Sequence, residues 1–103
     1  MVFLDSVKNL EEMMGYLRAS RPHLILLDLG RSSNQALMEI KKNTDLCAIP
    51  VVVFSEGQTE SDIRKGWLLG AVSFLPKPED PKDLMEMIGI LKQYWLELVE
   101  LPA

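Results

Sequence analysis

The chain has 103 residues, 48% hydrophobic and 25% charged, which is the composition of one globular domain and excludes a disordered tail or a disulfide scaffold. Its net charge is −4, and the only adjacent basic pairs are Lys41–Lys42 and Arg64–Lys65, so we expect no binding to nucleic acid. With one cysteine and one histidine, we expect neither an internal disulfide nor a zinc site. The sequence shows no export signal and no apolar run long enough to span a membrane, so we expect a cytoplasmic protein.

The first half of the chain alternates apolar runs with helical patterns. Residues 2–7 predict a short strand, and Asn9 is typical of a helix N-cap before an apolar stripe at i, i+3, i+4 and i+7. This helix ends before Pro22. The apolar run over residues 23–28 predicts a central strand covered on both faces, and residues 30–34 predict a loop.

The second half repeats the same alternation. A helical pattern ends near Asn43, and the β-branched run over residues 51–55 predicts another buried strand. Ser61 is the predicted cap of a helix that ends near Gly70, before a short strand over residues 71–75. A last helix is predicted from one long apolar stripe: Leu84, Met87, Ile88, Leu91, Trp95 and Leu98. This alternation predicts an α/β fold with a mostly parallel sheet and helices on both faces.

Three polar side chains lie at the carboxyl ends of the predicted strands, where parallel sheets carry their chemistry. They are Asp28, Ser55 and Lys77. An aspartate nucleophile, a hydroxyl that bonds a phosphoryl oxygen and an ammonium that offsets charge together indicate a phosphoryl-transfer site. Each residue alone is more typical of a cap or a solvated surface.

Three segments, residues 21–29, 49–55 and 69–78, resemble the third, fourth and last strands of receiver domains of bacterial response regulators. Residues 94–102 are similar to the C-terminus of regulators that work with cyanobacterial-type phytochromes. The resemblance covers nearly the whole chain and implies one receiver-like domain over residues 1–103. It also implies a flavodoxin-like three-layer sandwich with a parallel sheet.

The resemblance implies a role for each matching residue. Asp28 takes the phosphoacceptor position, Ser55 and Phe74 take the positions of the switch hydroxyl and the switch aromatic ring, and Lys77 takes that of the phosphate-contacting lysine. The Lys77–Pro78 peptide bond is implied to be cis.

The chain departs from this family around the same site. It starts where the family's second strand stands, so we expect an N-terminally truncated domain without the first strand, the first helix and the acidic pair that binds Mg²⁺. Asp28 alone is a poor magnesium site, and Asp5 is expected inside the first strand. The loop over residues 30–34 is shortened, and the carboxylate of Glu56 would clash with a phosphoryl group or take its place. We therefore expect no cofactor and no phosphorylation.

A missing central strand would leave unpaired backbone in the sheet, which is costly. Residues 2–7 could pair directly with residues 23–28, a second copy could swap in a strand, or a partner could donate one. A missing helix would uncover the last apolar stripe, which predicts a homodimer through the last helix and the tail. The stripe residues are Leu84, Ile88, Leu91, Trp95 and Leu98.

The sequence thus predicts a pseudo-receiver in two-component signal transduction, which is not an enzyme and acts by contact with a histidine kinase or another signalling protein. The alternative is a phosphoacceptor regulator modified on Asp28 by a histidine kinase, with a Mg²⁺ site that Glu56 or a partner completes. A third possibility is a fragment that results from a late gene start or a deletion.

Overall fold

The computed structural model describes residues 1–98, which form four strands and four α-helices in strict alternation. The strands are β1 (Val2–Leu4), β2 (Ile25–Leu27), β3 (Val51–Phe54) and β4 (Ser73–Leu75). The helices are α1 (Leu10–Ser20), α2 (Ser33–Lys42), α3 (Glu60–Leu68) and α4 (Pro81–Gln93). A 3₁₀ turn (Gly30–Ser32) precedes α2, and a π-helical turn (Tyr94–Leu98) extends α4.

The sheet is fully parallel, and its strand order is the order of the chain, β1-β2-β3-β4. Val2 is paired with Ile25, so the N-terminal strand lies directly beside β2 and the described sheet has no internal gap. Of the three ways to close the sheet that the sequence left open, the structure has the first, direct pairing within the chain. No swapped or donated strand is needed to satisfy the backbone of β2.

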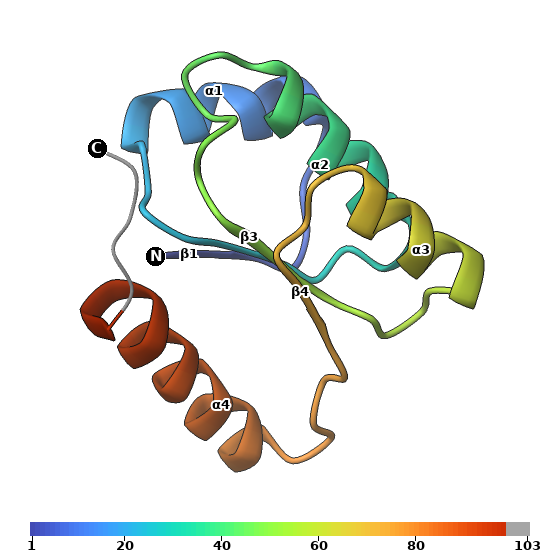
Figure 1. The fold of residues 1–103 in the computed structure, drawn as a ribbon, viewed down its shortest axis with the longest axis vertical. Helices are drawn as coiled ribbons and strands as arrows, with labels where there is room; N and C mark the ends of the chain where they lie inside the picture. The colour runs from blue at the N-terminus through green and yellow to red at the C-terminus, as the bar shows by residue number, and fades with distance from the viewer. Residues whose placement is uncertain (99–103) are drawn as a thin grey trace.

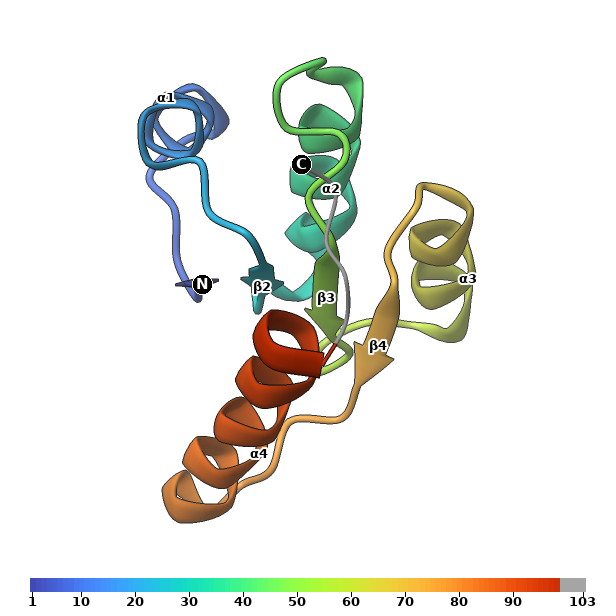
Figure 2. The ribbon, with the colours of Figure 1, turned by 60° about the vertical axis from the view of Figure 1, so that its left-hand side comes forward.

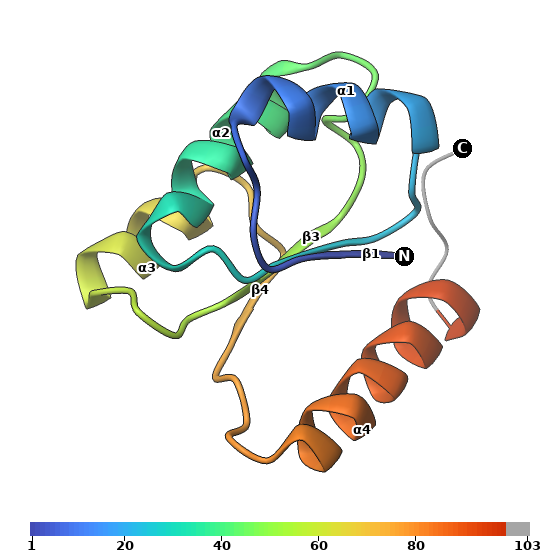
Figure 3. The ribbon, with the colours of Figure 1, turned by 180° about the vertical axis from the view of Figure 1, so that it is seen from behind.

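The helices divide unequally between the two faces of the sheet. Helices α1, α2 and α3 cover one face, and α4 alone lies on the other (Figures 1 and 3). Right-handed crossovers between strands that follow one another in one direction place all the connecting helices on the same side. The predicted flavodoxin-like α/β class and its three layers are confirmed, because α1–α3, the sheet and α4 are stacked in that order.

Side chains alternate between the two faces along each strand, as the pleat requires. Ile25 and Leu27 of β2 face the larger core beneath α1 and α2. Leu24 and Leu26 face α4, in a smaller buried cluster completed by Val52 and Phe54. The core toward α1–α3 is the more extensive one, whereas no residue of α4 is fully buried.

The predicted α4 stripe is not uncovered. Leu84, Ile88, Leu91 and Trp95 are half-buried and pack against the smaller cluster on the sheet. The prediction that this stripe is an open surface is therefore wrong. Because β1 closes up against β2, the sheet is narrow enough for α4 to cover its middle.

Local boundaries differ from the sequence interpretation. The strands predicted over residues 23–28, 51–55 and 71–75 are shorter by one to three residues. The first strand ends at Leu4, so Asp5 lies beyond it and not inside it. Residues 30–34 are helical rather than a loop, because the 3₁₀ turn runs directly into α2. Helix α3 is capped by Thr59, whose hydroxyl accepts a hydrogen bond from the Asp62 N–H at 3.1 Å, and not by Ser61.

The cap of α1 agrees with the prediction: the Asn9 side chain accepts a hydrogen bond from the Glu12 N–H at 2.8 Å. The helix is capped at its C-terminal end by Arg21, which has a left-handed backbone with φ of 43° just before Pro22. Within residues 1–98, every helix is too short or too polar to cross a membrane.

Candidate functional site

Asp28, Ser55 and Lys77 follow β2, β3 and β4 and lie at one edge of the sheet. The Asp28 N–H donates to the Leu4 carbonyl at 2.8 Å, and the Ser55 N–H donates to the Leu75 carbonyl at 2.9 Å. These bonds extend the ladders by one residue past each strand and fix both backbones. The edge predicted from the strand ends is thus present.

An ion pair joins Asp28 and Lys77 at the centre of this edge. The Lys77 Nζ lies 2.7 Å from Asp28 Oδ2, and the Asp28 side chain is only 9% exposed. The hydrogen bond to Asp28 and the negative charge of that carboxylate raise the pKa of Lys77 above its ordinary value. The carboxylate at the predicted phosphoacceptor position is therefore held by a positive charge on its own chain.

Glu56 faces the same ammonium from the solvent side. Its carboxylate lies 3.9 Å from the Lys77 Nζ, and the side chain is 65% exposed. Glu56, Lys77, Pro78 and Glu79 line a polar pocket of about 420 Å³. A carboxylate thus borders the space in front of Lys77, where the phosphoryl group of an acyl phosphate on Asp28 would need a cation.

Asp5 also belongs to this edge, which the sequence interpretation missed. It comes directly after β1, the neighbour of β2, and its charge contributes to the raised pKa of Lys77, after Asp28 and Glu56. The signal in the sequence is the low β-propensity of Asp5 and Ser6, which indicates that the first strand ends at Leu4.

The two predicted switch residues contact different elements of the fold: Ser55 contacts β4, and Phe74 contacts α3. The Ser55 hydroxyl donates to the Leu75 carbonyl at 3.4 Å. The Phe74 ring packs on α3, where its centroid lies 5.7 Å from that of Trp67 and its edge lies over Gly66. A Cβ atom on Gly66 would be 2.1 Å from Phe74 Cζ, so only glycine admits the ring in this position.

The 3₁₀ turn and the start of α2, which follow Asp28, are tied to the first turn of α3 and the residues just before it by a polar network that sequence reasoning did not anticipate. Asn34 donates to the Asp62 carbonyl at 2.7 Å, and Gln58 donates to the Gly30 carbonyl at 2.9 Å. Arg31 lies 3.4 Å from the Asp62 carboxylate. Hydrogen bonds from Thr59, and then the charge of Arg31, lower the pKa of Asp62.

The peptide bond implied to be cis is not cis: no cis peptide bond occurs within residues 1–98, so the Lys77–Pro78 bond is trans.

The described side chains at this edge offer few of the oxygen ligands that a magnesium ion takes. Mg²⁺ requires near-octahedral oxygen coordination, whereas no three His, Cys, Asp or Glu side chains of the described residues group closely enough to hold a metal ion. One oxygen of Asp28 is already occupied by Lys77, and Glu56 extends into solvent.

Residues 2–89 match the family model described as "Response regulator receiver domain". The chain is 39% identical over 103 residues to "Response regulator Rcp1" of Synechocystis sp. (strain ATCC 27184 / PCC 6803 / Kazusa), with 97% of this chain and 70% of that protein covered.

Two solved structures agree with the fold. The phosphorylated cyanobacterial phytochrome response regulator RcpA has a TM-score of 0.79 and 35% identity, over 94% of this chain and 76% of that one. The Mn²⁺-bound form of Rcp1 has a TM-score of 0.76 and 34% identity, over 94% of this chain and 77% of that one.

Proposed function

The chain belongs to the response regulator receiver domain family, and from this premise we propose that it signals by protein–protein contact without being phosphorylated. Receiver domains act in two-component signal transduction with histidine kinases or other signalling proteins, and they are generally not enzymes. The absence of an enzymatic activity in this chain is part of the proposal. The expected cytoplasmic location and the N-terminal truncation remain predictions.

The observation that carries the proposal is the donor set at the sheet edge. The Asp28 carboxylate is paired with Lys77 at 2.7 Å, and no group of three ligating side chains surrounds it within residues 1–98. Phosphoryl transfer relies on a metal ion to offset the charge of the transferred group. A nucleophile that has few ligands for this ion around it and is already paired with an ammonium is poorly suited to accept a phosphoryl group.

The topology supports the same conclusion. In open parallel sheets, ligands bind at the point where the strand order reverses and adjacent connections leave on opposite faces. The described sheet runs β1-β2-β3-β4 without a reversal, and its connecting helices α1–α3 share one face. The carboxyl edge therefore has no crevice of this type between β1 and β2.

The second candidate is a phosphoacceptor domain modified on Asp28, with Glu56 or a partner completing the metal site. Its support is the likeness to RcpA in its phosphorylated form and to Rcp1 in its Mn²⁺-bound form. Under this proposal Lys77 would release Asp28 and contact the phosphoryl group.

Intact mass after incubation with acetyl phosphate and Mg²⁺ separates the two. We expect no mass gain from the wild-type chain, because the edge does not assemble a metal site. The matched controls are Asp28→Asn and Asp45→Asn, the latter at an exposed aspartate paired with Arg21. A gain of one phosphoryl group in the wild type and in Asp45→Asn, lost in Asp28→Asn, would overturn the proposal.

An acyl phosphate can hydrolyse before detection, so a stable analogue supplies the second measurement. Trp67 lies against Phe74, beside the predicted switch, and its emission reports on that region. We expect beryllofluoride with Mg²⁺ to leave the emission unchanged in a chain that still unfolds cooperatively. A saturable change that Asp28→Asn abolishes would support the phosphoacceptor reading instead.

We further propose that the chain forms a homodimer through the end of α4 and the tail. The part of the tail at residues 99–103 lies outside the described residues, but Leu98 is 71% exposed and Tyr94 is exposed beside it. Light scattering at micromolar concentration should give twice the monomer mass for the wild type and the monomer mass for Leu98→Ser. A monomeric wild type at that concentration would contradict this proposal.

A further inference from the structure

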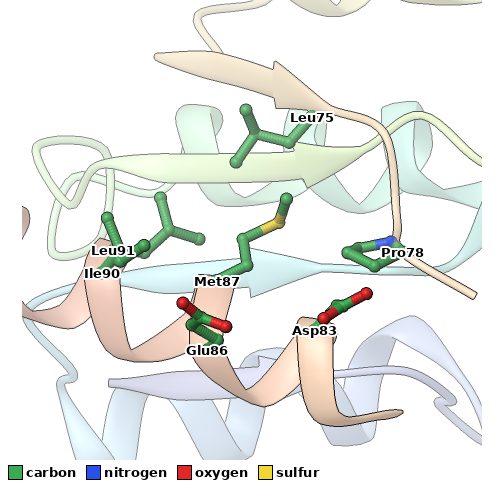
Figure 4. A pocket seen from close by; sticks show the side chains of 7 residues that line it. All are labelled: Leu75, Pro78, Asp83, Glu86, Met87, Ile90 and Leu91. Carbon is green, nitrogen blue, oxygen red and sulfur yellow. The ribbon is translucent and has the colours of Figure 1, made fainter. Parts of the chain in front are cut away.

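Two nucleophilic side chains, Lys41 and Cys47, lie together at the connection from α2 to β3, which enters the sheet at its amino end (Figure 2). The Lys41 Nζ donates hydrogen bonds to the Cys47 carbonyl at 3.1 Å and to the Ile49 carbonyl at 3.2 Å. Asp28 lies at the opposite, carboxyl edge of the sheet, and the apolar pocket of about 490 Å³ between α4 and β4 lies on the face opposite α2 (Figure 4). The pair is therefore separate from both.

The turn that carries Cys47 is held in place by its own backbone and by one core side chain. The Cys47 N–H donates to the Asn43 carbonyl at 2.8 Å, and the Ile49 N–H donates to the Leu46 carbonyl at 3.0 Å. Leu46 is fully buried, whereas Cys47 is exposed and its thiol lies 3.7 Å from the Thr44 carbonyl. The thiol is thus open to reagents in solvent while its position relative to the amine is fixed.

Covalent geometry keeps the amine within reach of the thiol. The carbonyl oxygen and the Sγ of one cysteine are at most about 5 Å apart, so the Lys41 Nζ lies at most about 8 Å from the Cys47 Sγ. The flexible stem of a lysine can carry its amine over the remaining distance by rotation about single bonds. An acyl group on the sulfur would therefore lie within reach of the amine.

The surroundings of Lys41 favour its neutral, nucleophilic form. The residue is half-buried, and its stem packs on the turn between α3 and β4, where a Cβ atom on Gly70 would be 3.3 Å from Lys41 Cε. Burial lowers the pKa of Lys41 below its ordinary value, and the charge of an ionised Cys47 thiol opposes this shift. A lowered pKa increases the fraction of free amine, which is the form that attacks a carbonyl carbon.

We propose that Lys41 is a site of acyl modification, at which the acyl group of an acyl thioester passes first to Cys47 and then to Lys41. The Cys47 thiolate attacks the acyl carbon of the donor, a new C–S bond forms, and the donor leaves as its thiolate. The Lys41 amine then attacks the same carbon, a C–N bond forms, and the C–S bond to Cys47 breaks. The proton lost by the nitrogen neutralises the released thiolate, so the products are an amide and a free thiol.

The second step gains from proximity, because the amine and the acyl carbon belong to one chain and need not meet by diffusion. Its product changes the contacts of the connection. An ammonium has three N–H donors, whereas a secondary amide has one, so at least one of the Cys47 and Ile49 carbonyls loses its donor. The modification therefore loosens the connection that leads into β3. This proposal does not depend on whether Asp28 is phosphorylated.

The first measurement is the rate at which individual lysines of the full chain are acetylated by acetyl coenzyme A, an acyl thioester, in mildly alkaline buffer. Peptide mass spectrometry reads out each position. Lys41 should react at least about tenfold faster than its neighbour Lys42, although the Lys42 side chain is 66% exposed. Equal rates at the two lysines would overturn the proposal, since exposure alone would then explain the reaction.

A variant without the thiol tests the route through sulfur. Cys47→Ser should slow the acetylation of Lys41 to the rate of Lys42, because the amine must then react with the donor in solution. The matched control is Ala48→Ser, which places the same hydroxyl at the next exposed residue and should leave the rate at Lys41 unchanged. A wild-type rate in Cys47→Ser, or equal slowing by both variants, would overturn the proposal.

Lys41→Arg should trap the intermediate, because arginine keeps the charge and the donors but stays protonated and accepts no acyl group. Intact mass should then show one acetyl group that hydroxylamine removes, whereas the acetyl group on the wild type should resist hydroxylamine. Cys47 is the only cysteine of the chain, so a thioester can form nowhere else. A Lys41→Arg chain that unfolds cooperatively and gains no such group would overturn the proposal. If this variant does not fold, the comparison of Cys47→Ser with Ala48→Ser, both at exposed positions, decides the question.

Discussion

Gly66→Ala should destabilise the fold by about 3 kcal/mol, the upper range for forcing extra volume into a packed site. Gly66 is buried in α3, and an added Cβ would lie 2.1 Å from Phe74 Cζ and 2.7 Å from Phe74 Cε2. The ring or the helix must move, which breaks the Phe74–Trp67 contact. The loss is measured as the change in the free energy of unfolding in urea.

The chain offers matched controls for this change. Gly15 and Gly89 also lie within helices, and nothing lies within 4 Å of the Cβ position at either one. Alanine at these positions should stabilise the chain by about 0.5–1 kcal/mol, because it restricts the unfolded chain and suits a helix. If Gly66→Ala changed the free energy of unfolding as Gly89→Ala does, the Phe74 ring would not lie against Gly66 on α3.

A double variant shows whether the ring itself is the obstacle. Phe74→Leu removes the atoms that the new methyl group meets, so the cost of Gly66→Ala in that background should fall by at least half. An unchanged cost would instead place the clash with Asn34, whose Oδ1 lies 2.9 Å from the same Cβ position.

Leu26→Ala should cost about 3 kcal/mol, within the range of 2–5 kcal/mol for a buried leucine. Leu26 is fully buried on β2 and belongs to the cluster that receives α4. The cavity would lie beneath a helix that has no fully buried residue of its own. Urea unfolding should report the loss, and hydrogen exchange in α4 should rise more than in α1.

Leu68→Ala is the control for this substitution. The same side chain is removed, but Leu68 is 83% exposed on α3, so the change in stability should stay within about 0.5 kcal/mol. A cost of the same size at both positions would mean that α4 and its cluster add little to the stability of the fold.

The order of elements could be predicted from the sequence because apolar runs and helical stripes carry it directly. The run before Asp28 and the β-branched run before Ser55 are the buried strands β2 and β3. The cap at Asn9 was also predictable, since its side chain acts on the next few residues. Such local signals can be interpreted without any knowledge of the tertiary structure.

The wrong predictions concern features that depend on contacts with other parts of the chain. Thr59 and Ser61 both suit a cap. Thr59 is the cap because its hydroxyl accepts from the Asp62 N–H and its own backbone N–H donates to the Asp62 carboxylate at 3.0 Å. An apolar stripe on α4 predicts that something covers it, but not whether the cover is the chain's own sheet or another molecule. Direct pairing of β1 with β2 decides this in favour of the sheet.

For the candidate site, the sequence predicted the edge of the sheet at which the polar side chains lie, but not the contacts between them. Asp28 and Lys77 meet because both follow strands of one parallel sheet, and their distance of 2.7 Å depends on side-chain packing. Asp5 was missed because one residue of error in the end of β1 moves it from the strand to the edge. The functional roles of Asp28, Ser55, Phe74 and Lys77 remain predictions.

The sequential strand order also has a consequence for how the chain folds. Each strand pairs with the strand synthesised just before it, between residues roughly two dozen positions apart, so the relative contact order of the sheet is low for a parallel architecture. Strands can therefore be added one at a time as the chain leaves the ribosome. Only α4 must return across strands already in place, so the face bearing Leu26 and Phe54 stays exposed until α4 has been synthesised.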